Sequence, residues 1–559
     1  MAVFEQDPDP IVTRLVNEDT VPWYRKRYLR SLYFVLFPAC MGIEMTSGFD
    51  SQLINALQFI PPFNTYFGDG YIDPTTGQLG INPPLLGIIN ASYSLGAIFA
   101  VPVAPYFNQL VGRRWAIMSG SVSMVIGALL QGFAQHVAMY IIARMLLGFG
   151  IVFAIISGSA LIGELAYPKE RPIMTSLFSA SYFFGAIIAA AISLRTAEMS
   201  GNWAWRIPSL LQCFPSILQI LFVFISSTDS PSWLPESPRY LISKDRDEEA
   251  FEILVKYHAE GDRDSIFVRA EMIEIKTTLK LEQEISKQTW IDMLRTSGMR
   301  RRVFIASMMG LFTQWSGNTL ISYYLSTILD MIGYNTTYAK TRINISNQCW
   351  SLVSAGIAAL TVTRFPRRRM FLLGTISMLL VFIGWTVSME RVLSANAKSM
   401  TNNSAAIAVL FFIYAYSPCY NIGNNALTYT YLIEIFPFAE RSRGIAIEQF
   451  FGRGAAFFST YVNPIALKAI TWKYLAVYCG WIFVEFCFVW FLYPETYRRT
   501  LEELAFLFED ASLSENVASA VEKQIHFGEN GVEYHPGKRS FMHLETLPAY
   551  MDERSAWSD

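Results

Sequence analysis

The sequence predicts an all-α membrane protein of twelve transmembrane helices, arranged as two six-helix bundles with a helical linker between them. Hydrophobic residues make up 52% of the 559 residues and charged residues only 16%, which is too apolar for a soluble chain of this length. Twelve apolar runs approach the roughly 20 residues that a helix needs to cross a bilayer. The third observation behind this fold class is an internal duplication.

The duplication consists of three short motifs that occur in the same order in both halves, offset by roughly 255 to 270 residues. The pairs are Gly112-Arg113-Arg114 with Pro366-Arg367-Arg368-Arg369, Glu164 to Arg171 with Glu434 to Arg441, and Pro235-Glu236-Ser237-Pro238-Arg239 with Pro494-Glu495-Thr496-Tyr497-Arg498. In a membrane protein, duplicated halves favour two bundles that rock around a central site, which is the architecture of secondary transporters.

The apolar runs set the order of the expected elements. The first bundle is expected over 31–226, with spans at about 33–57, 84–106, 115–134, 138–161, 175–194 and 206–226. The second is expected over 303–493, with spans at about 303–327, 341–363, 370–388, 405–433, 444–470 and 473–493. Residues 1–30, 227–302 and 494–559 form an N-terminal segment, a linker with two or three amphipathic helices, and an acidic tail expected to be disordered after about residue 511.

Basic residues set the expected orientation. One side of the predicted spans carries clusters at 25–30, 113–114 and 367–369, whereas the first loop on the other side, 58–83, has no Lys or Arg. The positive-inside rule therefore places both termini and the linker in the cytosol. No signal peptide is expected, because about thirty mostly polar residues precede the first long run. The sequons at Asn335 and Asn402 fall in outside loops and are candidate glycosylation sites.

No pattern for catalysis or metal binding can be recognised. The 6 cysteines lie in or beside predicted spans without metal-ligand or disulfide spacing, and the 5 histidines are scattered. Neither a paired nucleophile and base nor a phosphate-binding loop is found. We therefore expect no enzymatic activity, no cofactor, no metal and no nucleic-acid partner, and a chain that functions as a monomer in the lipid bilayer.

Several motifs resemble the signatures of one family. They are Arg144-Met145-Leu146-Leu147-Gly148-Phe149-Gly150, Glu164 to Arg171, Pro235 to Arg239, Gln314 with Ser316-Gly317-Asn318 and Tyr323-Tyr324, Glu434 to Arg441, and Pro494-Glu495-Thr496 followed by Thr500-Leu501-Glu502-Glu503. From about residue 31 to 508 the chain is similar to the sugar porter family of the major facilitator superfamily. Trp205-Arg206-Ile207-Pro208 and Tyr461-Val462-Asn463-Pro464 resemble its fungal lactose permease and hexose transporter-like branch in particular. The resemblance implies the major facilitator fold and a small-molecule substrate.

Duplicated charges at the expected cytosolic helix ends are candidates for a gate. They are Arg113, Glu164, Arg171, Glu236, Arg239, Arg367, Glu434, Arg441 and Glu495. Carboxylates and guanidiniums can form bidentate pairs there, with Glu164 and Arg171 in one half and Glu434 and Arg441 in the other. Such a network would hold the halves together while the cavity faces outward. The alternative is that these side chains only snorkel and determine topology.

A different pair of charges falls inside the predicted spans. Asp50 stands at the end of the first span and Arg144 lies within the fourth. An ionised residue inside a span costs at least about 2.5 to 3.5 kcal/mol, so we expect the two to pair. A change in their distance as the bundles rock could load or release a proton, and proton-linked sugar porters carry an aspartate here. The alternative is a static structural pair, and Glu44 is left without a role.

Uncharged polar side chains of the second half are the candidates for binding a substrate. They are Gln314, Asn318, Thr319, Tyr323, Tyr324, Asn425, Tyr429 and Asn463. Amides both donate and accept hydrogen bonds, as sugar hydroxyls do, and tyrosines offer flat apolar faces with polar tips. The resemblance places Gln314 at a sugar-contacting position. The site is expected to be polar but uncharged, although each amide could instead bond one helix to another.

Some residues depart from the family's pattern. Gln109 stands where Asp is usual before Gly112, Ser179 where the fungal branch tends to have an amide, and Tyr429 where glucose carriers commonly have Trp.

Three hypotheses for the function follow from the sequence. The first hypothesis is a sugar and proton symporter of the plasma membrane. The second is a carrier of the same fold for a non-sugar or secondary metabolite, including an exporter. The third is a nutrient sensor that does not transport.

Overall fold

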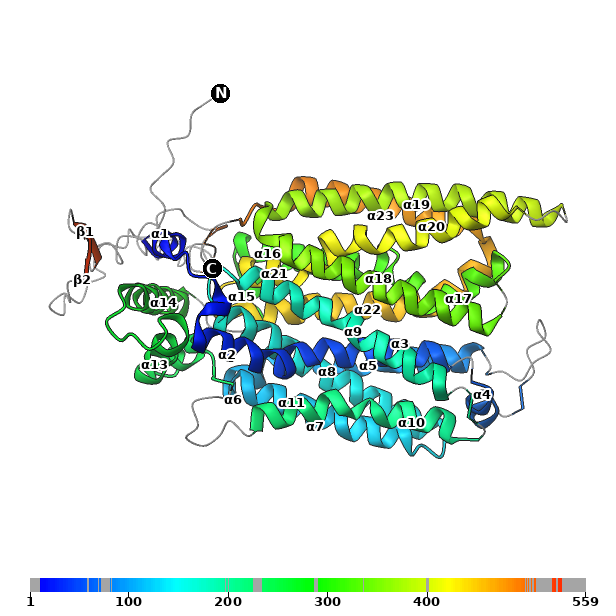
Figure 1. Cartoon of the computed structure of the whole chain (residues 1–559), viewed down its shortest axis with the longest axis horizontal. Helices are drawn as coiled ribbons and strands as arrows, with labels where there is room; N and C mark the ends of the chain where they lie inside the picture. The colour runs from blue at the N-terminus through cyan, green and yellow to red at the C-terminus, as the bar shows by residue number, and fades with distance from the viewer. Residues whose placement is uncertain are drawn as a thin grey trace, which may run out of the picture.

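The computed structural model describes residues 11–57, 60–68, 70–71, 81, 83–196, 198–199, 201–224, 234–285, 290–334, 336–398, 402–497, 499, 501, 504, 507–508, 525–528 and 531–534. These residues form an elongated helical body with a group of short helices at one end (Figure 1). Eight described helices are long and apolar enough to cross a membrane, or nine if the bent pair at Leu85–Ala100 and Ala104–Val111 is one span.

Six helical rods come from the first half of the chain. They are α2–η2–α3 (Arg27–Leu36, Phe37–Met41, Gly42–Leu57), α5–α6 (Pro83–Ala100, Ala104–Val111), α7 (Arg113–Gly132), α8 (Val137–Leu165), α9 (Arg171–Thr196) and α10–α11 (Trp203–Leu211, Cys213–Phe224). α8 packs against α5 and α7, and α3 packs against α9. A Cβ at Gly148 would lie 1.9 Å from the carbonyl oxygen of Tyr93, so α8 and α5 meet backbone to backbone, as small residues allow in membrane helices.

Six more rods come from the second half. They are α16–α17 (Ser297–Trp315, Asn318–Met331), α18 (Thr337–Thr361), α19 (Arg367–Ala397), α20–η5–α21 (Asn403–Tyr420, Asn421–Asn425, Ala426–Ile435), α22 (Phe438–Ile470) and α23 (Trp472–Leu492). Here α16 packs against α22, and α19 packs against α20 and α23. Each of the twelve predicted spans overlaps one rod, although α16, α17, α18 and α22 do not pass the length and apolarity test. The predicted all-α membrane fold of the major facilitator type is confirmed.

The two halves meet along helices from the middle of the body. α9 lies against α18 and α21, and α5 lies against α22. The end of the body at which α13 and α14 lie is called the linker end below, and the end at which α4 (Pro61–Phe67) lies is called the opposite end (Figure 1).

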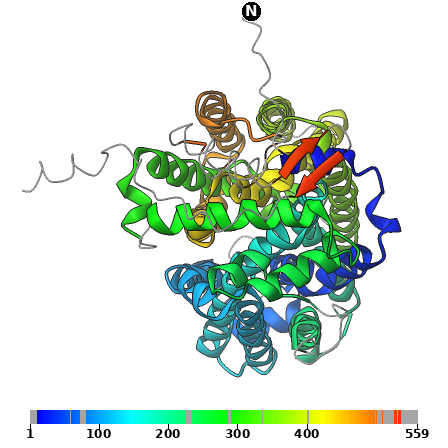
Figure 2. The same cartoon turned by 90° about the vertical axis from the view of Figure 1, so that its left-hand side faces the viewer.

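The linker forms more helix than expected. Its helices are α12 (Pro238–Ser243), α13 (Asp247–His258), α14 (Ile266–Ile285) and α15 (Asp292–Arg295), and they lie across the end of the body in Figure 2. α12, α13 and α14 share a small core that includes Leu241, Leu254 and Val268. Nδ1 of His258 lies 2.7 Å from Oε2 of Glu271, and its Nε2 lies 3.3 Å from the carbonyl oxygen of Leu165 at the end of α8. The linker is therefore attached to the first half.

The terminal segments carry short elements. Before the first rod lie α1 (Ile11–Glu18) and the 3-10 turn η1 (Trp23–Arg25), and a second 3-10 turn, η4 (Val362–Arg364), precedes α19. In the tail, β1 (Ile525–Gly528) and β2 (Gly531–Tyr534) pair antiparallel, which differs from the disorder expected after residue 511. Alternation of apolar and polar residues, as in Ile525-His526-Phe527, explains why this piece forms strands.

Candidate functional site

A cavity of about 140 Å³ lies between the two halves. From the first half it is lined by residues of α3, α5 and α9, including Ser47, Tyr93 and Tyr182. From the second half it is lined by residues of α16, α17, η5, α21 and α22. Most of the lining side chains are polar, although the helices that carry them are largely apolar. Polar groups far apart in the sequence therefore surround one space.

Interruptions in two rods place polar residues of the second half at this cavity. α16 ends at Trp315 and α17 begins at Asn318, and Gly317 between them has a φ of 100°, which glycine adopts without strain. A Cβ at Gly317 would also lie 2.2 Å from Cζ of Phe382. The five-residue π-turn η5, Asn421–Asn425, interrupts the rod of α20 and α21. Such interruptions are frequent at functional sites and at transporter binding sites.

Five of the predicted substrate-binding residues line the cavity. They are Gln314, Asn318, Thr319, Asn425 and Tyr429. The hydroxyl of Thr319 donates to the backbone carbonyl of Gln314 at 3.0 Å, and Ser322 donates to Oδ1 of Asn318 at 3.3 Å. The first contact holds α17 against the end of α16, and the second, within α17, orients the amide of Asn318.

The other predicted substrate-binding residues are placed differently. Oδ1 of Asn463 accepts hydrogen bonds from the hydroxyls of Tyr474, at 2.6 Å, and Tyr478, at 3.0 Å. The hydroxyl of Tyr324 donates to the carbonyl oxygen of Thr460 at 2.5 Å. Neither Asn463 nor Tyr324 lines the cavity, and both connect one helix to another, which is the alternative that the sequence left open. The side chain of Tyr323 lies outside the described residues.

The cavity is charged, whereas the sequence was interpreted as giving an uncharged site. Glu44 on α3 and Glu448 and Arg453 on α22 all line it. The hydroxyl of Tyr429 donates to Oε1 of Glu44 at 3.1 Å, and Nε2 of Gln449 donates to that hydroxyl at 3.1 Å. A polar chain therefore crosses from one half to the other. The rule that charges inside spans mark functional sites, applied to the run 444–470, would have identified Glu448 and Arg453.

Asp50 on α3 and Arg144 on α8 form a buried ion pair. Nη1 of Arg144 lies 3.2 Å from Oδ1 of Asp50, and Nη2 donates to Oδ2 at 3.4 Å. Nε2 of Gln212 also donates to Oδ1 at 2.9 Å, while Nε of Arg144 donates to the carbonyl oxygen of Ile89 at 2.9 Å. Both charged residues are 2% exposed, and neither lines the cavity. The carboxylate is thus held by a cation and an amide away from solvent.

A further buried carboxylate, missed in the sequence, lies in the second half. Glu485 on α23 accepts hydrogen bonds from the hydroxyl of Ser316 at 2.6 Å and from the amide of Asn424 at 2.8 Å. Within the described part of the chain, no basic nitrogen lies within 4.0 Å of it. Because Asn424 lines the cavity, Glu485 lies directly behind the cavity wall.

Predicted gate residues of the first half cluster at the linker end. Nε of Arg113 lies 3.2 Å from Oε2 of Glu164. Glu236 accepts hydrogen bonds from the backbone amides of Arg113 and Arg114, each at 3.2 Å, at the first turn of α7. Arg239 donates to the carbonyl oxygen of Glu164 at 3.3 Å. The linker motif therefore covers the start of α7 and the end of α8.

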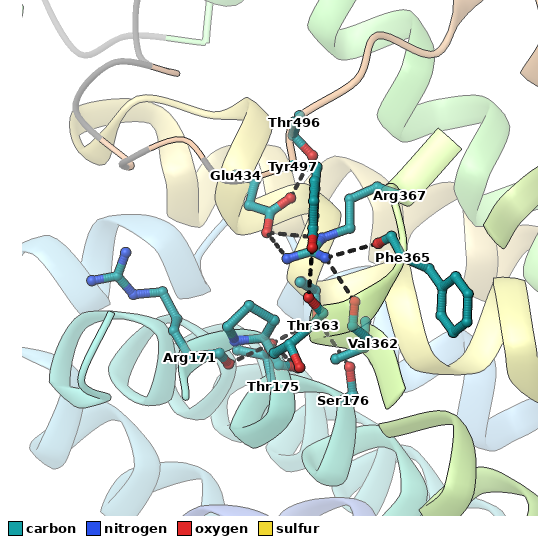
Figure 3. Close-up of polar contacts among 12 residues, drawn as sticks. Arg171, Thr175, Ser176, Val362, Thr363, Phe365, Arg367, Glu434, Thr496 and Tyr497 are labelled. Atoms are coloured by element: carbon teal, nitrogen blue, oxygen red, sulfur yellow. Dashed lines mark hydrogen bonds and ion pairs between the residues drawn. The ribbon is translucent and has the colours of Figure 1, made fainter. Parts of the chain in front are cut away.

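The second half repeats this arrangement (Figure 3). Nη2 of Arg367 lies 3.3 Å from Oε1 of Glu434, and the hydroxyl of Thr496 donates to Oε2 of Glu434 at 2.5 Å. Glu495 accepts from the backbone amides of Arg367, at 2.8 Å, and Arg368, at 3.2 Å. The duplicated motifs thus have duplicated geometry.

The pairing inside the gate differs from the expected one. Glu434 meets Arg367 rather than Arg441, and Nη1 of Arg441 instead lies 3.1 Å from Oε1 of Glu164, across the two halves. The physical reason is that the residues seven positions apart lie on either side of the break between two helices, so they face different neighbours.

Other polar contacts join the halves near this ion pair. The hydroxyls of Thr175 and Thr430 lie 2.6 Å apart, and Ser176 donates to the carbonyl oxygen of Ala426 at 2.6 Å. Nδ2 of Asn108 donates to the hydroxyl of Ser442 at 2.9 Å. The two halves are therefore in contact on the linker side of the cavity.

Of the candidate glycosylation sites, one lies among the described residues. Oδ1 of Asn402 accepts a hydrogen bond from the backbone amide of Ala405 at 3.1 Å and caps α20. Asn335 lies outside the described residues.

Comparison with known proteins gives consistent matches along the chain. A sequence profile described as "Sugar (and other) transporter" matches residues 35–508. The MFS-type transporter oryC of Aspergillus oryzae is 30% identical over 428 residues, which cover 75% of this chain and 76% of that protein. The high-affinity glucose transporter of Kluyveromyces lactis is 26% identical over 507 residues, which cover 86% of each.

Solved structures share the arrangement of the helices. The proton:xylose symporter XylE bound to 6-bromo-6-deoxy-D-glucose has a TM-score of 0.72 at 21% identity and covers 86% of this chain and 100% of that chain. The inward-open conformation of the xylose transporter XylE from E. coli has a TM-score of 0.62 at 21% identity, with the same coverage. The present arrangement is therefore closer to the ligand-bound structure than to the inward-open one.

Proposed function

Because this chain belongs to the sugar porter family of the major facilitator superfamily, we propose that it is a proton-coupled carrier of a sugar or a related polyhydroxylated metabolite. It works in a membrane by alternating access, with residues 31–226 and 303–493 as the two units that move. The observation that carries the proposal is the polar cavity between the halves, closed on the linker side by the contact of Glu164 with Arg441.

The geometry suits a cycle with two states. In the state described here, the ion pair and the hydroxyl contacts at the linker end join the halves, so they block the passage of substrate toward that end. Opening the linker end requires Arg441 to leave Glu164, and Arg113 then remains as the partner that keeps this buried carboxylate from being unpaired. Each half thus retains its own ion pair when the halves part.

The substrate would bind to amides and tyrosines of the second half and to Tyr93 and Tyr182 of the first half, which also line the cavity. Gln314, Asn318 and Asn425 offer donors and acceptors to hydroxyl groups, and Tyr429 connects the second half to Glu44 of the first. A ligand bound between them contacts both halves at once. Its binding free energy can therefore favour the closed arrangement around it.

Asp50 is the proposed proton carrier. Its carboxylate has Arg144 and Gln212 as partners on α8 and at the end of α10, so movement of α3 relative to these helices changes its electrostatic environment. A carboxylate held in this way can be ionised in one state and protonated in the other. Because Asp50, Arg144 and Gln212 all belong to residues 31–226, this proposal requires α3 to move within that half as the halves rock.

The basic clusters support an orientation with both termini and the linker in the cytosol. In that orientation the linker end, at which the halves are joined in this state, faces the cytosol, and uptake across the plasma membrane by a monomer is the proposed setting. Asn335 and Asn402 then lie on the outer side and can be glycosylated.

A carrier of a non-sugar metabolite, including an exporter, is the second candidate. The charged lining of the cavity favours it, because neutral sugars need no Glu448 or Arg453. Two of the similar proteins are named only as MFS-type transporters.

Uptake into proteoliposomes that contain the full chain tests the proposal. We expect at least one of a panel of labelled sugars, sugar acids and polyols to enter, faster when the pH is lower on the side from which it enters. Liposomes without protein are the control. If no member of the panel moves in either direction, with or without a pH gradient, the proposed function is wrong.

A further inference from the structure

Three ionisable side chains share the central cavity, and the proposed sugar-binding role uses none of their charges. Glu44 and Glu448 are 7% and 3% exposed, and Arg453 is half-buried beside them. Charges inside a bundle are costly unless they are paired or serve a substrate pathway. The protein partners of each ionisable group therefore indicate which charge a ligand of this cavity should carry.

Arg453 has an incomplete set of protein partners. Its Nε donates to Oε1 of Gln449 at 3.2 Å, and its Cζ lies 5.6 Å from the centre of the Tyr93 ring. Within the described residues, no carboxylate oxygen lies within 4.0 Å of its guanidinium and no hydrogen bond leaves its two terminal nitrogens. The planar fork of donors that suits a carboxylate is thus available at the cavity wall.

The two carboxylates are held by uncharged groups. Oε1 of Glu44 accepts from the hydroxyl of Tyr429 at 3.1 Å, and Oε2 of Glu448 accepts from Nε2 of Gln449 at 2.9 Å. Neither lies within 4.0 Å of a basic nitrogen of the described chain. A carboxylate can become neutral by binding a proton, whereas a guanidinium stays charged. The positive charge of Arg453 is therefore the one charge that the cavity always carries.

Resting on the proposed function of this cavity, we propose that the transported substrate is a hydroxylated organic acid, such as a sugar acid, whose carboxylate binds Arg453. The amides of Gln314, Asn318 and Asn425 then bind its hydroxyl groups from the other helices of the second half. Protonation of both Glu44 and Glu448 would remove the repulsion between their carboxylates and the bound acid. A neutral sugar would leave the guanidinium of Arg453 without a carboxylate in direct contact among the described residues.

Binding of matched ligands to the purified full chain tests this inference. D-Glucose, D-glucuronate and D-glucosamine share one ring and differ in charge, and D-gluconate, D-galacturonate and quinate extend the set of acids. We expect at least one acid to bind more than tenfold tighter than its neutral or amine counterpart. Arg453→Gln should remove this preference, and Arg453→Lys, which keeps the charge, should retain most of it.

Arg391→Gln is the control, because Arg391 is 73% exposed and pairs with its neighbour Glu390 far from the cavity lining. It should keep the preference for the acid. Tighter binding of glucosamine, failure of every acid to bind, or an acid affinity that Arg453→Gln leaves unchanged would each overturn the inference.

Uptake distinguishes this inference from the proposed function. Transport of glucose without transport of any acid would support the proposed carrier function and contradict the inference that the substrate is an organic acid. Tight binding of an acid that depends on Arg453, without transport of any ligand, would uphold the charge chemistry of the cavity and contradict the carrier.

Discussion

Nη1 of Arg441 lies 3.1 Å from Oε1 of Glu164, and this contact joins the second half of the chain to the first. The same carboxylate lies 3.2 Å from Nε of Arg113 within its own half. The side chains of Arg441 and Glu164 are 2% and 0% exposed, so water screens this interaction little. When the linker end opens, the buried carboxylate of Glu164 therefore keeps Arg113 as a partner and loses Arg441.

Replacing either member of the contact between the halves should impair transport. Hydrogen bonds to charged groups contribute about 1.5 to 3 kcal/mol, so Arg441→Ala should shift the balance between the two states by about 10- to 150-fold toward an open linker end. Glu164→Gln should act in the same direction and also weaken the contact with Arg113. Initial uptake rates in proteoliposomes, at equal amounts of folded protein, should fall at least about tenfold.

Arg391→Ala is the matched control, since this arginine is 73% exposed and lies at the opposite end of α19. It should transport at the normal rate. Normal rates in both Glu164→Gln and Arg441→Ala would remove the gate assignment.

Gln314→Ala should weaken substrate binding. Gln314 lines the cavity at the end of α16, and its loss leaves a substrate hydroxyl without a partner, which costs about 1 to 3 kcal/mol. Titration calorimetry with whichever ligand the wild type transports measures the change. An unchanged dissociation constant for every transported ligand would show that the substrate binds elsewhere.

Asn463→Ala should affect stability rather than affinity. Its amide oxygen accepts from Tyr474 and Tyr478, which lie on α23, so its removal leaves one half-buried and one buried hydroxyl without their acceptor. We expect unfolding to require about 1 to 3 kcal/mol less, with the dissociation constant of the ligand unchanged. Weaker ligand binding at unchanged stability would restore Asn463 to the substrate site.

The helices could be predicted from the sequence, because each span is a long apolar run whose length is set by the bilayer. For example, the run predicted at 138–161 became α8, Val137–Leu165. The partner of Asp50 could also be predicted, since Arg144 was the one charge available in its span and a buried charge needs a counter-charge.

Contacts between helices could not be predicted to the same extent. Glu164 and Arg171 are close in sequence, but α8 ends at Leu165 and α9 begins at Arg171, and only the packing of the halves brings Arg441 to Glu164. Asn463 and Asn425 have the same side-chain chemistry, and each lies in a predicted span. The direction that each side chain faces, toward α23 or toward the cavity, follows from the crossing of helices rather than from local sequence.

Glu271 should make the attachment of the linker sensitive to acid. Burial raises the pKa of Glu271, but His258, Arg239 and Arg171 lower it more, so its pKa lies below the ordinary value. Because folding lowers this pKa, the contact with His258 stabilises the folded linker above the ordinary glutamate pKa of about 4.3, and this stabilisation is lost as the pH falls through the lower, folded-state pKa.

Hydrogen exchange of α13 and α14 measures this effect. At pH 6, Glu271→Gln should lower the free energy of local opening by about 1.5 to 3 kcal/mol relative to wild type, and the difference should shrink as the pH falls below the ordinary glutamate pKa of about 4.3 and vanish only below the folded-state pKa. Glu252→Gln, in an exposed pair with Arg263, should change it by less than about 1 kcal/mol. A difference that stays constant with pH would show that Glu271 acts through packing alone.

Asp50→Asn should separate proton coupling from substrate movement. The carboxylate of Asp50 can carry one proton in each cycle only if it is ionised in one state and protonated in the other, and the amide fixes a neutral form of nearly the same size. Substrate-driven proton entry and accumulation against a gradient should disappear. Exchange of labelled for unlabelled substrate across the membrane should survive, because the side chains that line the cavity are untouched. External alkalinisation on adding substrate, measured in cells with wild type or variant, checks proton entry, and loss of labelled substrate into a medium that contains unlabelled substrate checks exchange. If the wild type transports without any pH change under any gradient, the protein is a passive facilitator and Asp50 has a structural role.

Full uphill accumulation by Asp50→Asn would show that another buried carboxylate carries the proton. Glu44→Gln and Glu485→Gln would then identify that carboxylate. Glu44 lies at the cavity and Glu485 lies directly behind its wall, and neither has a basic partner among the described residues.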